Sequence, residues 1–119
     1  MNALIADDNP LRHECFRVLE ALGWTVHHAG TVEAAQAFLE NETYQLVALD
    51  HDFTATDCMT LPEEATGRGL AKKVAGLAVK PPLVIVHTAN VAARAIMVKT
   101  LADAGIRVCV MPLSNVFPR

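Results

Sequence analysis

Short apolar runs alternate along the chain with segments whose apolar positions recur every three or four residues. The runs are brief and rich in β-branched or aliphatic residues, which is typical of buried strands. They cover residues 3–6, 25–26, 46–49, 83–86 and 108–110. Strands that alternate with helical segments predict an α/β fold, with a parallel sheet and right-handed crossover connections.

Four segments between these runs have helical periodicity and recognisable ends. The first helix is expected to begin at Asn9, which can cap it, and to end before Gly23. Thr31 is placed to cap a second helix, and the other two are expected over residues 70–77 and 92–104. We therefore predict a three-layer, flavodoxin-like fold with five parallel strands in the order 2-1-3-4-5.

Acidic residues directly follow the first and third predicted strands. Asp7 and Asp8 end the first apolar run, and Asp50 ends the third. The carboxyl ends of neighbouring parallel strands share one edge of the sheet, so these three carboxylates are expected to meet over one pocket. They repel one another unless some are protonated or a hard cation such as Mg²⁺ lies among them. The sequence predicts a divalent-metal pocket, and a solvated sheet edge is the alternative.

Composition narrows the class of protein without changing this picture. A chain of 119 residues, 52% hydrophobic, fits a single domain over residues 1–119. No apolar run reaches the roughly 20 residues needed to cross a bilayer, and the N-terminus lacks the features of a signal peptide. The three cysteines lack paired zinc spacing, so we expect a reducing, cytoplasmic compartment and no membrane partner.

The net charge of −3 and the absence of a basic cluster limit the nucleic-acid ligands to be expected. They argue against tight, sequence-independent binding of a phosphate backbone. They remain compatible with the binding of one nucleotide or of one RNA end.

Three segments resemble the receiver domains of response regulators, and the resemblance covers nearly the whole chain. They are "LIADD" on the first strand, "LVALD" on the third and "VIVHTA" on the fourth. The resemblance implies that Asp7 and Asp8 hold Mg²⁺, that Asp50 is the phosphoacceptor and that Thr88 contacts the phosphoryl group.

Two features depart from ordinary receivers. Met111 stands before Pro112 where receivers carry a lysine, so a direct partner of the phosphoryl oxygens is missing. Residues 113–119 are too few for the helix that usually closes the fold. We therefore expect one sheet face to be partly uncovered and to bind a second copy of the chain, a partner protein or a docked segment.

The chain is more similar to a divergent subgroup, the cyclic-phosphate-processing receivers. The matching segments are "DDNPLRH", "LDHDF" and "VHTAN", with "TGRG" at residues 66–69 in an adjoining loop. The similarity implies a reaction at cyclic phosphate ends of nucleotides or RNA. The site that it implies consists of Asp7, Asp8, Arg12, Asp50, His51, Asp52, His87, Thr88 and Asn90.

Opening a cyclic phosphodiester with water requires a base, an acid and positive charge on the phosphate oxygens. Histidines exchange protons near neutral pH, and two of them lie at the predicted sheet edge. The catalytic candidates are Asp50, His51 and His87. The candidates for phosphate or ligand binding are Arg12, Asp52, Thr88 and Asn90. The metal candidates are Asp7, Asp8 and Asp50, with Mg²⁺ or Mn²⁺ as the ion.

Two other functions remain open at this stage. One is a signalling receiver phosphorylated on Asp50, and the other is a pseudo-receiver that only binds a partner protein. Three further histidines receive no role, and solvated or edge-strand positions are expected for them. They are His13, His27 and His28.

Overall fold

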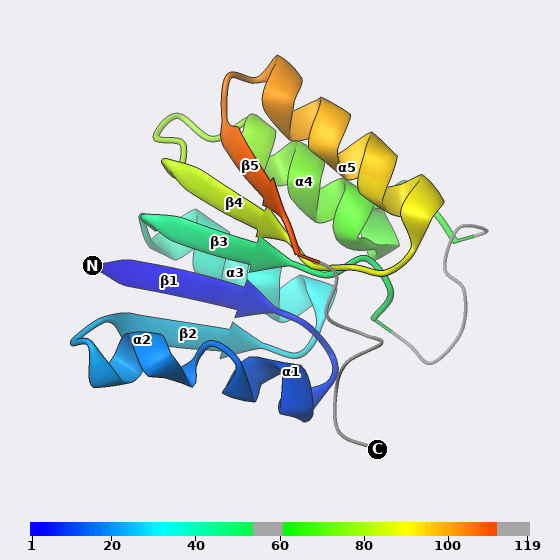
Figure 1. Ribbon diagram of the computed structural model, residues 1–119. Coiled ribbons are helices and arrows are strands. Elements are labelled where there is room, and N and C mark those ends of the chain that lie inside the picture. Colours follow the sequence, from blue (N-terminus) through cyan, green and yellow to red (C-terminus); the bar gives the residue numbers. More distant parts are fainter. Residues whose placement is uncertain (54–60, 112–119) are drawn as a thin grey trace.

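Five parallel strands form one sheet at the centre of the fold (Figure 1). The computed structural model describes residues 1–53 and 61–111. The strands are β1 (Asn2–Ala6), β2 (Thr25–Ala29), β3 (Leu46–Leu49), β4 (Leu83–Val86) and β5 (Arg107–Val110). Their order is β2-β1-β3-β4-β5, which confirms the flavodoxin-like arrangement predicted from the sequence.

Helices lie on both faces of this sheet. They are α1 (Pro10–Glu14), α2 (Arg17–Ala21), α3 (Val32–Asn41), η1 (Glu63–Ala65), α4 (Gly67–Ala75) and α5 (Val91–Asp103). Figure 1 shows α3, α4 and α5 on one face, with α1 and α2 on the other face beside β2. Within the two described ranges, no helix is long and apolar enough to cross a bilayer.

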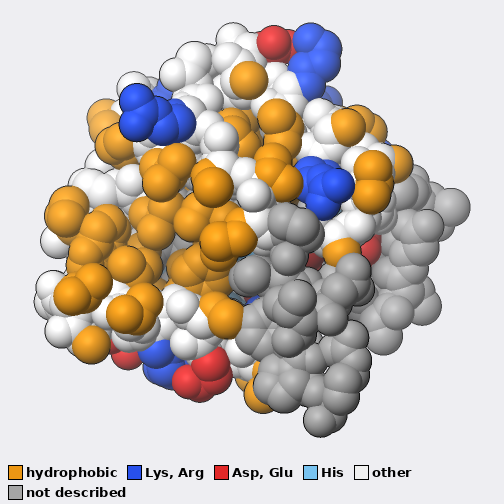
Figure 2. Space-filling model, in the orientation of Figure 1, with side chains coloured by type: hydrophobic (Ala, Val, Ile, Leu, Met, Phe, Trp, Pro, Cys, Tyr) orange, Lys and Arg blue, Asp and Glu red, His pale blue; other side chains and the backbone are white. Residues whose placement is uncertain are grey.

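The sheet face beside α1 and α2 carries much exposed apolar surface. Figure 2 shows hydrophobic side chains gathered there. Val18, in the first turn of α2, and Leu22, which directly follows α2, are 60% and 70% exposed. The expected loss of the closing helix concerns residues 112–119, which lie outside the described residues.

The first helix is divided in two, whereas the sequence predicts a single continuous helix. Cys15 and Phe16 separate α1 from α2, and the N–H of Phe16 donates to the carbonyl of His13, three residues earlier (3.0 Å). The tightened turn brings the Phe16 side chain, 4% exposed, against Ile5 and Ala48 of the sheet. Burial of this ring offsets the interrupted helical hydrogen bonding.

The register of the sheet places three site residues at one level. Ala6 pairs with Leu49, and Leu49 pairs with Val86, so these strands end together. Backbone bonds of the ladder continue one residue further, from the N–H of Asp50 to Ala6 and from that of His87 to Leu49, each 3.0 Å. The residues directly after the aligned row are Asp7, Asp50 and His87.

The pleat of the strands divides the site residues between the two faces. Ile5, Ala48 and Ile85 pack with Phe16 on the face that carries α1 and α2. Residues two positions further along each strand continue that side, and they are Asp7, Asp50 and His87. His51 and Thr88, which follow Asp50 and His87, continue the opposite side, where α4 and α5 lie.

Glycines allow α4 to begin in direct contact with the end of β3. The N–H of Gly67 donates to the carbonyl of His51 (3.0 Å), and a Cβ at Gly67 would lie 2.6 Å from the His51 Cα. At Gly69 a Cβ would lie 2.6 Å from the carbonyl oxygen of Glu63. Only glycine fits both approaches, so the "TGRG" segment fixes α4 against the site.

We expect Gly67→Ala to destabilise the protein by about 2 kcal/mol or more, because the added methyl group meets backbone atoms that cannot rotate away. Gly76→Ala is the matched control, since its Cβ would lie 3.5 Å from the carbonyl oxygen of Lys72, an ordinary contact. That variant should change stability by less than about 1 kcal/mol. Urea denaturation followed by circular dichroism measures both, and equal stabilities of the two variants would contradict the close packing.

Candidate functional site

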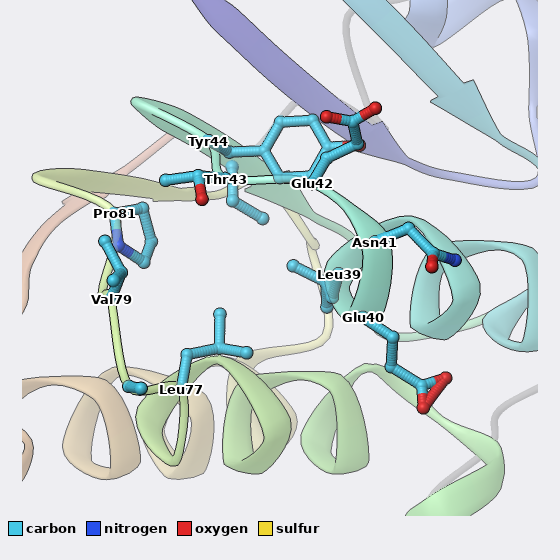
Figure 3. Close-up of a pocket in the computed structure, with 11 residues that line it drawn as sticks. Leu39, Glu40, Asn41, Glu42, Thr43, Tyr44, Leu77, Val79 and Pro81 are labelled. Carbon is cyan, nitrogen blue, oxygen red and sulfur yellow. The ribbon is translucent and has the colours of Figure 1, made fainter.

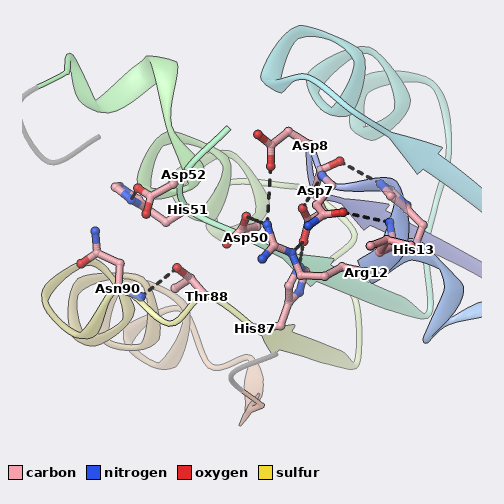
Figure 4. Close-up of polar contacts among 12 residues, drawn as sticks. Asp7, Asp8, Arg12, His13, Asp50, His51, Asp52, His87, Thr88 and Asn90 are labelled. Carbon is pink, nitrogen blue, oxygen red and sulfur yellow. Dashed lines mark hydrogen bonds and ion pairs between the residues drawn. The ribbon is translucent and has the colours of Figure 1, made fainter. Parts of the chain in front are cut away.

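Asp7 is the buried anchor of the site, and its carboxylate accepts three hydrogen bonds (Figure 4). Arg12 Nε and His87 Nε2 donate to Oδ2 at 2.7 and 2.8 Å, and the N–H of Asn9 donates to Oδ1 at 2.8 Å. Burial alone would raise the pKa of Asp7, but the hydrogen bonds from His87, Arg12 and Asn9 outweigh it and lower the pKa. Asp7 is therefore an ionised acceptor.

The Arg12 guanidinium extends from Asp7 to the two other acids of the site. Its Nη2 lies 3.5 Å from Asp50 Oδ2 and 3.7 Å from Asp8 Oδ1. Burial disfavours its charge, but the carboxylates of Asp7, Asp50 and Asp8 outweigh burial and raise the pKa of Arg12. One permanent cation thus lies among the three carboxylates for which the sequence predicts a metal ion.

The single charge of Arg12 does not neutralise all three acids. The pKa values of Asp50 and Asp8 are therefore raised. Burial, followed by the charge of Asp7, raises the pKa of Asp50 to about 6. The same two causes raise the pKa of Asp8, whose side chain is 27% exposed at the rim. Asp50 therefore gains or loses its proton near neutral pH.

His87 is completely buried, and its imidazole is hydrogen-bonded to the Asp7 carboxylate. Because the Asp7 carboxylate is an acceptor, His87 Nε2 must carry the hydrogen that joins them. Among the buried side-chain atoms of residues 1–53 and 61–111, His87 Nδ1 alone has no hydrogen-bond partner. The Phe16 ring lies 5.7 Å from the imidazole, so His87 has an apolar neighbour on the sheet face.

The donor atoms of the site fit a divalent cation. Asp7, Asp50 and His87 each offer one ligand atom, and these atoms lie within 4.8 Å of one another. Carboxylate oxygens suit Mg²⁺, and an imidazole nitrogen also suits Mn²⁺. In the arrangement described, however, hydrogen bonds and the Arg12 ion pairs already engage the carboxylates of Asp7 and Asp50.

His51 belongs to a second cluster on the opposite side of Asp50. Figure 4 shows His51 and Asp52 on the far side of Asp50 from Arg12. His51 is fully buried, with Nδ1 2.6 Å from Asp52 Oδ1 and Nε2 3.0 Å from Arg68 Nε. Arg68 can only donate, so His51 Nε2 accepts and Nδ1 donates to Asp52. His51 thus joins a carboxylate and an arginine.

Arg68 is a site residue that the sequence reasoning did not identify as a candidate. It lies on the first turn of α4, where the Thr66 hydroxyl accepts from its backbone N–H at 3.3 Å. The available signal was the pair of glycines on either side of it, which mark a close approach of backbone segments.

Thr88 and Asn90 begin α5 at the same edge of the sheet. Thr88 Oγ1 accepts from the N–H of Asn90, and Asn90 Oδ1 accepts from the N–H of Ala93, both at 3.1 Å. Thr88 is 2% exposed, and its hydroxyl hydrogen can still be donated. Both residues therefore lie where the sequence places them, with a structural role in capping the helix.

The three unassigned histidines include one that supports the site. His28 is on edge strand β2, as expected, but His13 is only 8% exposed. His13 Nε2 lies 2.8 Å from the carbonyl oxygen of Asp7, to which it donates, and its Nδ1 lies 2.7 Å from His28 Nδ1. Burial lowers the pKa of His13. His13 thus fixes the backbone of Asp7, and no sequence pattern indicated this contact.

A separate cavity of about 250 Å³ lies at the opposite edge of the sheet (Figure 3). Leu39, Leu77 and the buried Tyr44 are among the residues that line it. Burial raises the pKa of Tyr44 to about 12, so its hydroxyl stays protonated. No residue that the sequence assigns to the site lines this cavity.

The raised pKa of Asp50 predicts a pH-dependent effect of Asp50→Asn on stability. The carboxyl group is ionised in both folded and unfolded protein at pH 8, where burying the charge costs stability, and it is protonated in both at low pH. In metal-free buffer the variant should be more stable than wild type by on the order of 1–3 kcal/mol at pH 8. This advantage should shrink as the pH falls from about 6 to about 4.

Urea denaturation at pH 4.5 and pH 8 measures this difference. Asp103→Asn is the control, because Asp103 is an exposed carboxylate paired with Lys99 at 2.8 Å. It should change stability by less than about 0.5 kcal/mol at both pH values. An Asp50→Asn effect of the same size at both pH values would contradict the raised pKa.

Solved structures with the same fold are receiver domains of response regulators. A response regulator protein from Burkholderia pseudomallei, which holds a phosphorylated aspartic acid, a calcium ion and citrate, is 22% identical with a TM-score of 0.68. The match covers 97% of this chain and 61% of that one. A receiver domain protein from Methanospirillum hungatei JF-1 is 23% identical, with a TM-score of 0.63 and coverage of 95% and 82%.

A third structure, the receiver domain of the Francisella response regulator 1452, is 16% identical, with a TM-score of 0.62 and coverage of 95% and 85%. No curated protein matches the chain in sequence. The model of one family, described as the cyclic-phosphate processing receiver domain, matches residues 3–103 and so includes the whole edge from Asp7 to Asn90. The chain belongs to the cyclic-phosphate processing receiver domain family.

Proposed function

We propose that the carboxyl edge of the sheet binds a phosphate-containing ligand and opens cyclic phosphate ends of nucleotides or RNA. The main support is Asp50, a buried carboxyl group with a pKa of about 6 whose Oδ2 lies 3.5 Å from Arg12. A group that exchanges a proton at neutral pH beside a fixed positive charge suits this chemistry. The description of the family names the processing of cyclic phosphate.

The proposed reaction forms a P–O bond to a water oxygen and breaks a P–O bond to a ribose oxygen. Asp50 would take the proton that the attacking water loses, and Arg12 would hold the non-bridging oxygens of the phosphate. The ribose oxygen must gain a proton as it leaves, and His51 and His87 remain our candidates for this step. Both are buried, so their access to the ligand requires a change in the hydrogen bonds described above.

Ligand binding would involve the second cluster as well. Asp52, Thr88 and Asn90 lie on the His51 side of Asp50 (Figure 4), and their polar groups suit phosphate or ribose. Arg68 adds a second guanidinium, which His51 holds in place. Mg²⁺ or Mn²⁺ held by Asp7, Asp8 and Asp50 would add positive charge at the phosphate oxygens.

The test is phosphorus NMR of the protein with Mg²⁺ or Mn²⁺ and a 2′,3′-cyclic nucleotide. We expect conversion to a monophosphate, lowered about 100-fold or more in Asp50→Asn because the base is lost. His51→Ala and His87→Ala should also be impaired. His27→Gln is the matched control, since His27 is a histidine on β2 that contacts Tyr44 instead of the site, and it should retain the activity.

The other outcomes separate the alternatives. Metal-dependent shifts of the phosphorus signal without conversion would leave a phosphate-binding domain. Formation of phosphoaspartate from a small phosphodonor, abolished in Asp50→Asn, would favour a signalling receiver. No conversion, no shift and no phosphoaspartate would contradict every function that uses the site.

We further propose that the apolar face beside α1 and α2 binds a second copy of the chain. Exposed Val18 and Leu22 supply apolar surface, and a twofold interface can cover both copies at once. Analytical ultracentrifugation should give the sedimentation coefficient of a dimer, and Leu22→Glu should shift it to that of a monomer. A monomeric wild-type chain would reject the dimer.

A further inference from the structure

Arg12 occupies the position at which the site would need a metal ion. Its guanidinium lies 2.7 Å from Asp7, 3.5 Å from Asp50 and 3.7 Å from Asp8, the three carboxylates that the sequence assigns to the metal. Only 14% of the Arg12 side chain is exposed, so the contacts are largely shielded from solvent. They supply positive charge to the pocket from within the chain.

A divalent ion and the guanidinium compete for the same carboxylate oxygen atoms. Asp7 Oδ2 accepts from Arg12 Nε at 2.7 Å, and Asp50 Oδ2 lies nearest to Arg12 Nη2. An ion that binds these atoms would also place two positive charges within a few ångströms of the guanidinium, at a considerable electrostatic cost. Release of the guanidinium would remove both this competition and this repulsion.

We propose that Arg12 is the resident cation of this pocket, and that a divalent ion binds by displacing its guanidinium, which then becomes available to the phosphate of the ligand. The inference rests on the proposed function, because it uses the same pocket and the same class of ligand. It adds a role for Arg12 in setting how tightly the pocket holds a metal.

The surroundings of Arg12 allow the side chain to move while the backbone stays in place. The start of α1 is capped by Asn9, whose side chain accepts from the N–H of Leu11 at 2.9 Å. His13, the next residue, is bound to the carbonyl of Asp7. These contacts hold the short helix on either side of Arg12, so the exchange involves rotations of one long side chain.

The exchange couples the two ligands of the site. A metal ion that releases Arg12 raises the affinity for phosphate, and by linkage phosphate raises the affinity for the metal to the same extent. In the absence of both, the ion pairs with Arg12 reduce the repulsion among the three carboxylates. The pocket is thereby stable in its metal-free form.

The first test measures Mn²⁺ binding to the full chain by calorimetry and by the electron paramagnetic resonance signal of free Mn²⁺. Arg12→Gln should bind Mn²⁺ about tenfold more tightly than wild type, because a unit charge close to the ion is removed. Arg17→Gln is the matched control, since Arg17 pairs with Glu14 and Glu20 at 2.8 and 3.5 Å on the surface. Its Mn²⁺ affinity should equal that of wild type.

The second test requires no variant and so does not depend on whether Arg12→Gln folds. In wild-type protein labelled with ¹⁵N-arginine, the Nε–H of Arg12 should be protected from exchange with water in metal-free buffer. Saturating Mg²⁺ should make that exchange at least about tenfold faster, because the hydrogen bond to Asp7 is broken. The Nε–H of Arg17 serves as the internal reference.

The outcomes distinguish this inference from the proposed function. Equal or weaker Mn²⁺ affinity in Arg12→Gln, or an Arg12 Nε–H that stays protected with Mg²⁺ bound, overturns the displacement and leaves the hydrolysis assay unaffected. If neither wild type nor Arg12→Gln binds Mn²⁺, the metal pocket fails together with this inference. In that case, the phosphorus NMR assay alone would decide whether the protein opens cyclic phosphates without a metal.

Discussion

The common register of β1, β3 and β4 is the constraint on which the rest of the site depends. Because Ala6, Leu49 and Val86 pair across the sheet, the next residue of each strand reaches the same level on the same side. Backbone hydrogen bonds hold this row, so the side chains need no flexible loop to bring them together. A one-residue slip of β3 would turn Asp50 away from Arg12.

The pleat then gives the two faces of the sheet different chemistry. Towards α1, three carboxylates surround one arginine, and each hydrogen bond to Asp7 lowers the cost of burying its charge. Towards α4, His51 joins Asp52 to Arg68 without requiring a metal. Asp50 belongs to the first set, and its backbone contacts Gly67 of α4, so both sets adjoin it.

Sequence reasoning predicts the parts of the site that depend on local patterns. Asp7, Asp50 and His87 directly follow recognisable strands, so parallel-sheet geometry brings them together. Arg12 lies in the short helix that follows the first strand. The engagement of His51 by Arg68 depends on how closely α4 approaches β3, and the break at Phe16 depends on the packing of its ring against Ile5 and Ala48. Both are set by tertiary packing, which local periodicity does not encode.

The close backbone contact at Gly67, between α4 and the end of β3, also determines which part of the site can move. There, backbone lies against backbone at Gly67, and no side-chain rotation exists that could absorb a displacement. On the other side of Asp50, the site is bounded by the long Arg12 side chain, which lies on a helix of five residues. A ligand bound as proposed would meet fixed backbone on the Gly67 side and an adjustable side chain on the Arg12 side.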